Sequence, residues 1–96
     1  MGKLFLPARV PNEGARRLAA WLQSVPPVRA IRAMGNAGID AAKVDRLIAG
    51  ELIPGADERW AIACATGHAV YVRDWSVAAC GRWGDPVPAR MRRRAA

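Results

Sequence analysis

Apolar residues in the first half of the chain recur every three or four positions, which is the spacing of one face of a helix. The first such stretch begins at Asn12, a residue type favoured as an N-cap, and ends at the pair Pro26-Pro27. It predicts a helix with an inward face formed by Leu18, Trp21, Leu22 and Val25, and a wet side formed by Arg16, Arg17 and Gln23. A second helix is predicted after Pro27, with Ile31 and Met34 inward, and the glycines at 35 and 38 end it.

The third predicted helix is short, from its N-cap Asp40 to Gly50. Its inward stripe is formed by Val44, Leu47 and Ile48, and Ile39 fills the turn before it. At about 100° per residue, the side opposite this stripe carries small or charged residues, namely Ala42, Asp45, Arg46 and Ala49, with Lys43 on the flank. The core therefore accounts for one side of this helix and leaves the other side for a different role.

A fourth helix is predicted from Asp57 and Glu58 to a stop at Gly67. Its residues are apolar almost all round, so we expect it to be central in the fold. We also expect Trp21 and Trp60 to lie in the core, because both sit at helical spacing among other apolar residues.

The pattern changes after the fourth helix. Residues 69–75 are rich in β-branched and aromatic side chains and predict a short strand, after which Ser76 caps a final helical turn to Gly81. Trp75 and Trp83 fit either the core or a dimer contact. The predicted fold is thus mainly α, with four to five helices over residues 12–83, a short β element near residues 69–75, an arm or short edge strand at 1–11, and a basic flexible tail at 84–96.

Composition indicates one small domain with a polyanionic partner. The chain of 96 residues is 52% apolar and carries a net charge of +7, and 13 of its 15 basic residues are arginine, whose planar fork matches phosphate oxygens. Subtracting the arginines at 90, 92, 93 and 94 leaves +3 on the remainder. No stretch approaches 18 consecutive apolar residues, and the start is too short for a signal peptide, so we expect a cytoplasmic protein with no membrane partner.

Two short helices joined by a tight glycine-containing turn, the second with a polar outer face, are the arrangement that places a helix in the DNA major groove. Gly38-Ile39-Asp40, followed by Val44, Leu47 and Gly50, resembles the turn and recognition helix of the Cro and phage-repressor type helix-turn-helix regulators. Ile53-Pro54 with residues 61–63 and 65–70 is similar to the small YdaS-like prophage subset. The resemblance covers roughly residues 28 to 72, and it departs from the family pattern at Met34, Gly35 and Leu47.

The resemblance implies a division of roles. The residues expected to meet bases are Ala41, Ala42, Asp45 and Arg46, and those expected near phosphates are Arg29, Arg32, Asn36 and Lys43. The tail residues Arg90, Arg92, Arg93 and Arg94 would follow the backbone or enter a minor groove, or else form a solvated terminus without a DNA role.

The sequence thus predicts a DNA-binding transcriptional regulator of prophage or mobile-element type, nucleoid-associated, which inserts helix 40–50 into the major groove of double-stranded DNA. One such helix spans few base pairs, so a homodimer is expected, with residues 70–75 and the segment to Trp83 as its apolar surface. The alternative is a protein-interaction module, antitoxin-like or associated with RNA polymerase, that uses the same fold without base readout.

Catalysis, metals and cofactors are not expected. Cys64, His68 and Cys80 are the only cysteine and histidine residues. Gly67 interrupts the i, i+4 spacing of the first two, and a closed structural site would need a fourth ligand. The lone histidine has no nucleophile placed by a motif, and no glycine-rich phosphate loop is present. Without a CxxC pair, the two cysteines are expected to be reduced thiols.

Overall fold

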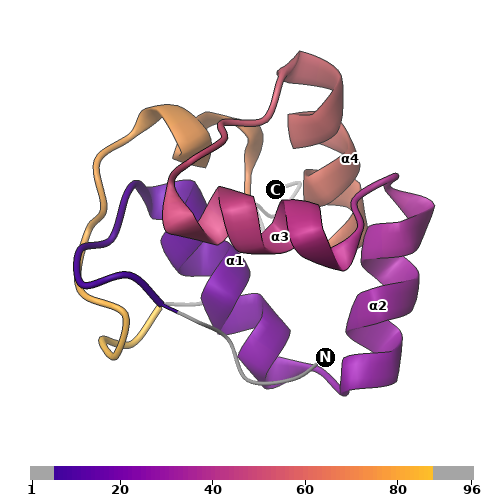
Figure 1. Ribbon diagram of the computed structural model, residues 1–96, viewed down its shortest axis with the longest axis horizontal. Coiled ribbons are helices and arrows are strands. Elements are labelled where there is room, and N and C mark those ends of the chain that lie inside the picture. Colours follow the sequence, from indigo (N-terminus) through magenta and orange to yellow (C-terminus); the bar gives the residue numbers. More distant parts are fainter. Residues whose placement is uncertain (1–5, 88–96) are drawn as a thin grey trace, which may run out of the picture.

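The computed structural model describes residues 6–87, and all of the regular structure in this part of the chain is helical (Figure 1). Its elements are α1 (Glu13–Ser24), α2 (Pro27–Asn36), α3 (Ala41–Ala49), α4 (Ala56–Ala65) and one turn of 3-10 helix, η1 (Val72–Ser76). The mainly helical prediction is confirmed. The predicted strand at 69–75 is wrong, because residues 6–87 contain no strand and η1 occupies most of that segment. The helical turn expected from Ser76 to Gly81 is also absent from this part of the chain.

The helix boundaries come from the capping residues that the sequence indicates. The carboxamide oxygen of Asn12 accepts a hydrogen bond from the backbone N–H of Ala15 at 2.7 Å, and a carboxylate oxygen of Asp40 accepts one from Lys43 N–H at 2.8 Å. Each bond satisfies a donor that the first helical turn leaves unpaired. Gly50 ends α3 in the left-handed conformation, at φ +80°.

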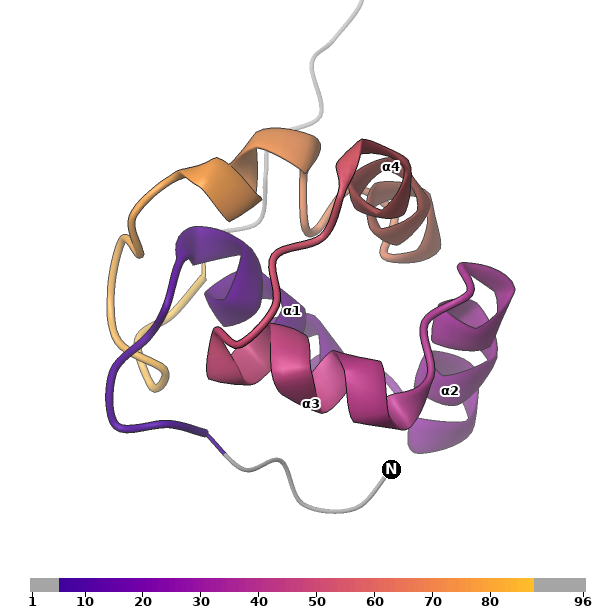
Figure 2. The same ribbon diagram turned by 45° about the horizontal axis from the view of Figure 1, so that its top comes forward.

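The core lies where α1 meets α3 and η1, with α4 packed on η1 and on α2. Figure 1 shows α3 crossing in front of α1, and Figure 2 shows α2 and α4 on the side of the molecule away from the N-terminal arm. The large side chains of this core are Leu18, Leu22, Met34, Ile39, Val44, Leu47, Ile48, Ile62, Val70 and Trp75.

Two large apolar residues that were expected inside are at the surface. Trp60 of α4 is 55% exposed and Ile31 of α2 is 53% exposed, so these two predictions are wrong. Only Ile62 and Ala63 of α4 are buried, so α4 is peripheral and its predicted central position is also wrong. In α2 the inward stripe is Ala30 with Met34, one turn apart, which turns Ile31 outward. Trp21 is partly buried against the core.

Trp75 takes the central place that Trp60 does not. Its side chain is 2% exposed and rests directly on α1, where a Cβ added at Gly14 would lie 2.3 Å from Trp75 Cδ2. A glycine is therefore required at this point of α1 to admit the indole ring. The turn that delivers the ring is closed by Asp74, whose carboxylate accepts a hydrogen bond from Tyr71 N–H at 2.7 Å, and this local bond is why the segment turns instead of extending.

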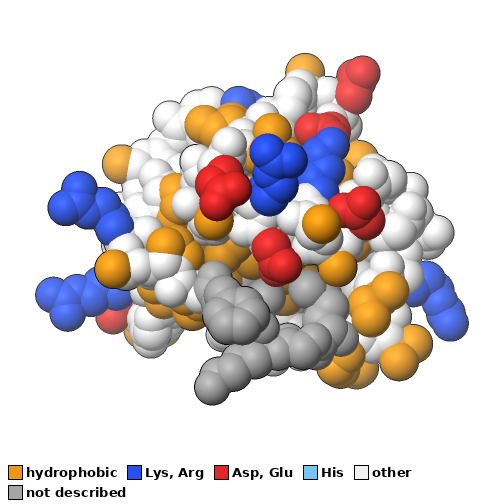
Figure 3. All heavy atoms as spheres, viewed as in Figure 1, with side chains coloured by type: hydrophobic (Ala, Val, Ile, Leu, Met, Phe, Trp, Pro, Cys, Tyr) orange, Lys and Arg blue, Asp and Glu red, His pale blue; other side chains and the backbone are white. Residues whose placement is uncertain are grey.

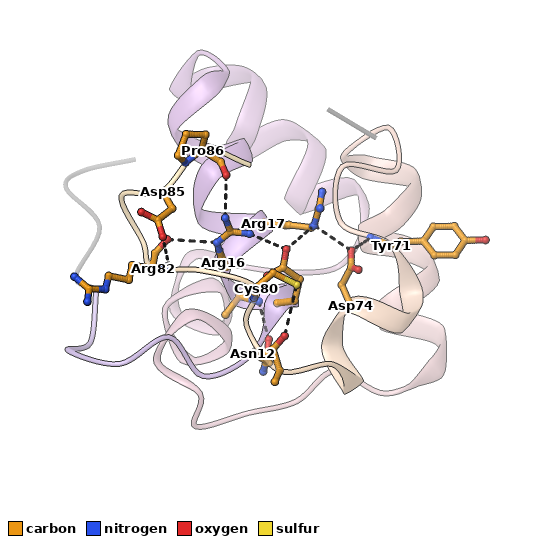
Figure 4. A network of polar contacts seen from close by, with 12 residues as sticks. Asn12, Arg16, Arg17, Tyr71, Asp74, Cys80, Arg82, Asp85 and Pro86 are labelled. Atoms are coloured by element: carbon orange, nitrogen blue, oxygen red, sulfur yellow. Dashed lines mark hydrogen bonds and ion pairs between the residues drawn. The ribbon is translucent and has the colours of Figure 1, made fainter. Parts of the chain in front are cut away.

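A buried ion-pair network joins residues 77–87, here called the C-terminal segment, to α1 (Figure 4). Glu13, 2% exposed, accepts hydrogen bonds at 2.8 Å from Arg16, Arg17 and the backbone N–H of Cys80. The Arg16 guanidinium also donates to the carbonyl oxygens of Arg82, at 3.3 Å, and Pro86, at 2.9 Å. Arg16 is therefore buried, and its predicted place on the wet side of the first helix is wrong.

Candidate nucleic-acid interface

The turn between α2 and α3 sets the orientation of α3 relative to α2. Gly38 has φ +78°, and the Ile39 N–H donates to the Met34 carbonyl at 2.9 Å. A Cβ at Gly38 would meet nothing within 4 Å, so it is the left-handed backbone, and not lack of space, that favours glycine here. Ile39, 2% exposed, anchors the turn in the core, as the sequence indicates.

α3 buries one side and presents the other. Val44, Leu47 and Ile48 are at most 1% exposed, and the opposite side is exposed at all four residues expected to meet bases, which are Ala41, Ala42, Asp45 and Arg46. Figure 3 views this side and shows charged side chains of both signs gathered over α3. The predicted exposure of these four residues is therefore confirmed.

Each of the two cations on this surface has a carboxylate partner from outside α3, which the sequence did not predict, and with Asp45 the carboxylates outnumber the cations by one. Arg46 Nε lies 3.8 Å from a carboxylate oxygen of Glu51, with both side chains well exposed, and Lys43 is paired with Glu58 at the start of α4. The hydrogen bond from Lys43 lowers the pKa of Glu58 below its ordinary value. Asp45 adds a further exposed carboxylate. An exposed pair such as Arg46 with Glu51 is worth only about 0 to 1 kcal/mol, so Arg46 can exchange its partner.

The residues expected near phosphates differ in where the structure places them. Arg29 and Arg32 are exposed on α2, and no ion pair is found for either within the described residues. Asn36 is also exposed, and it lines a hollow between α2 and α4, away from the outer side of α3. The candidates Arg90, Arg92, Arg93 and Arg94 lie outside the described residues.

An apolar hollow lies where α2 meets the start of α3. It measures about 260 Å³ and is lined by Ile31, Met34, Gly35, Ile39, Asp40, Ala41 and Val44. Val28, 68% exposed, lies one helical turn before Ile31 on the same face of α2. The sequence did not predict this apolar surface of α2, because Ile31 was expected to face the core.

Three further features of residues 6–87 bear on the sequence expectations. This part of the chain contains no cluster of three or more His, Cys, Asp or Glu side chains able to hold a metal ion. Cys64 and Cys80 are free, exposed thiols. Among the same residues, no helix has the length and apolar character needed to cross a lipid bilayer.

Comparison of the chain with models of known protein families, with curated proteins and with solved structures gave no significant match.

Proposed function

We propose that the protein is a sequence-specific DNA-binding regulator that inserts α3 into the major groove of double-stranded DNA. One observation carries this proposal: α3 follows a tight glycine turn, and Ala41, Ala42 and Arg46 are exposed on the side opposite its buried stripe. The major groove is about 12 Å wide and admits one helix, provided that the outer side of that helix is free and not bulky.

The side chains of this surface suit base readout. The two alanines allow the α3 backbone to approach base edges and thymine methyl groups closely. A bidentate contact from Arg46 to guanine discriminates by about 1 to 3 kcal/mol, which exceeds the 0 to 1 kcal/mol of an exposed ion pair. Because the exposed pair with Glu51 is weak, it does not prevent Arg46 from contacting a guanine, and Asp45 would accept a hydrogen bond from a cytosine amino group.

Arg29 and Arg32 on α2 supply backbone contacts that fix register without reading sequence. Lys43 contributes less than the sequence suggested, because Glu58 already holds its ammonium group. The proposed regulator is of the Cro-like, prophage type, and it would act in the cytoplasm by occluding a promoter or by recruiting RNA polymerase.

Adequate specificity for one short helix calls for a second copy on a two-fold site. A homodimer therefore belongs to the proposal, but its surface differs from the one the sequence suggested. Val70 and Trp75 are in the core, and Trp83 is partly buried against it. The exposed apolar residues on the helices are Val28, Ile31 and Trp60, and these are available to a second copy.

A protein-interaction module is the second candidate, and the carboxylate partners of the α3 cations together with the apolar hollow beside Ile31 favour it. An antitoxin-like or polymerase-binding role would place a partner's apolar side chain in that hollow. Salt dependence separates the two functions. Phosphate contacts give a log–log slope of about −0.9 each, whereas a mainly apolar interface changes little with salt.

The experiment is a selection of bound oligonucleotides from a random duplex pool at near-physiological salt, followed by affinity measurements on the selected and a scrambled duplex. We expect Arg46→Ala to reduce the ratio of the two affinities by about tenfold, which corresponds to about 1.4 kcal/mol. Arg73→Ala is the matched control, because Arg73 is exposed on η1 and its loss changes net charge equally.

A recovered motif whose affinity ratio falls for Arg46→Ala and not for Arg73→Ala supports the proposal. Equal loss on both duplexes would assign Arg46 to the backbone. Failure to recover any motif, together with affinity that does not vary with salt, would favour the protein-interaction module.

A further inference from the structure

We propose that Arg9 and Arg82 form a second phosphate site, which grips the DNA backbone beyond the C-terminal end of α3. This inference rests on the proposed function. It assigns a role to two arginines that come from opposite ends of the chain and that the motif around α3 does not include.

The two residues line one hollow of about 620 Å³ on the surface. Both are exposed, and no acidic side chain is among the described residues that line the hollow with them. The remaining lining includes Gly81, Trp83 and Gly84. This setting differs from the α3 surface, where each cation has a carboxylate partner. Arginine is also the side chain that best matches phosphate, because its planar fork donates two parallel hydrogen bonds.

The hollow is held together by contacts that do not use either guanidinium. Trp83 Nε1 donates to the carbonyl oxygen of Pro7 at 2.7 Å, which joins the N-terminal arm to the C-terminal segment. The backbone N–H of Arg82 donates to Asp85 Oδ2 at 2.9 Å, and its carbonyl accepts from Arg16. Figure 4 shows the Arg82 side chain directed away from this network. The backbone that carries the two arginines is therefore held in place, and neither guanidinium takes part in an ion pair within residues 6–87.

The location relative to α3 indicates what the site binds. The side chain of Pro11 packs against Gly50, the C-cap of α3, where an added Cβ would lie 2.7 Å from Pro11 Cβ. Arg9 is two residues before Pro11, so the arm runs past the C-terminal end of α3. In both Figure 1 and Figure 2 the arm and the C-terminal segment lie on the opposite side of the molecule from α2. Figure 3 shows basic side chains projecting at both of these margins.

The spacing suits the two strands of a duplex. A helix with its side chains is about 10–12 Å in diameter, which fits the ~12 Å width of the major groove, so the elements on either side of α3 lie toward the two strands. With α3 in the groove, Arg29 and Arg32 face the backbone on one side, and Arg9 and Arg82 face it on the other. This second site also compensates for the paired cations of α3, because it adds two cations that attract the polyanion.

The test compares the salt dependence of duplex binding for the wild type, Arg9→Ala/Arg82→Ala, Arg9→Lys/Arg82→Lys and the control Arg73→Ala. For the double alanine variant we expect the log–log slope to become shallower by about 1.8, equally on selected and scrambled duplexes. The lysine variant keeps the charge and should recover most of the slope. Because both side chains are exposed, the variants should melt within a few degrees of the wild type, which a thermal scan verifies.

The outcomes distinguish this inference from the proposed function. If the wild type binds duplex with a steep slope and the double alanine variant keeps that slope, the second site is refuted while the regulator assignment stands. If the wild type binds no duplex, both fall. If inorganic phosphate alone shifts the NMR signals of the Arg9 and Arg82 side chains and a duplex does not, the site binds a free anion and the inference is overturned.

Discussion

Glu13→Gln tests the buried network that holds the C-terminal segment, and with it Arg82, against α1. The substitution keeps the shape of the side chain and removes its charge, which leaves the Arg16 guanidinium, 4% exposed, without its ion-pair partner. Loss of one partner of a buried pair costs about 3 to 5 kcal/mol. We expect the lower end, about 3 kcal/mol, because Arg16 keeps two carbonyl acceptors.

Urea unfolding followed by tryptophan fluorescence measures this cost. With a denaturant slope of about 1 to 3 kcal/mol per molar, the midpoint should fall by about 1 to 3 M. Glu51→Gln is the control, because it neutralises an exposed carboxylate 3.8 Å from Arg46 and should change stability by less than about 1 kcal/mol. A midpoint for Glu13→Gln that matches the Glu51→Gln value would refute the reasoning that the network is buried and stabilising.

Two further predictions concern packing and pH. Gly14→Ala should reduce the free energy of unfolding, measured by urea, by about 1 to 3 kcal/mol, because the added Cβ would overlap Trp75. Gly35→Ala, in open space within α2, should increase it by about 0.5 to 1 kcal/mol. The opposite order would contradict the packing of Trp75. Glu58 has a lowered pKa owing to its bond from Lys43, so its stabilising contribution is present at neutral pH and is lost as pH falls below 4.5 through its folded pKa. The Tm of Glu58→Gln should therefore lie below that of the wild type at about pH 7 and approach it at about pH 3. A Tm difference that does not change with pH would contradict this linkage.

The elements that the sequence predicts well are those with local causes. α3 lies between the N-cap Asp40 and the left-handed C-cap Gly50, and these two local signals fix its ends. The stripe of Val44, Leu47 and Ile48 is buried as its spacing predicts. The exposed side of α3 follows from the same pattern. These features need no knowledge of the rest of the chain.

The features that the sequence does not predict depend on contacts between distant segments. Whether Trp60 or Trp75 enters the core is decided by the space that Gly14 leaves, 61 positions before Trp75 in the chain. Arg16 is on the polar side of a helical wheel, yet the segment through Pro86 covers it. The pairing of Lys43 with Glu58 likewise joins two helices. A single-helix pattern contains no information about such partners.

The outer side of α3 is the surface on which the account depends, and an NMR titration of the labelled protein with a selected duplex tests it directly. We expect the largest backbone amide shifts in α3, at Ala41, Ala42 and Arg46, with smaller shifts in α2 and around Arg9 and Arg82 at the opposite margin. The amides of η1 should serve as the internal reference, because η1 packs against α1 and α4. Saturable shifts confined to η1 and α4, with α3 unchanged, would contradict the proposal that this helix enters the groove.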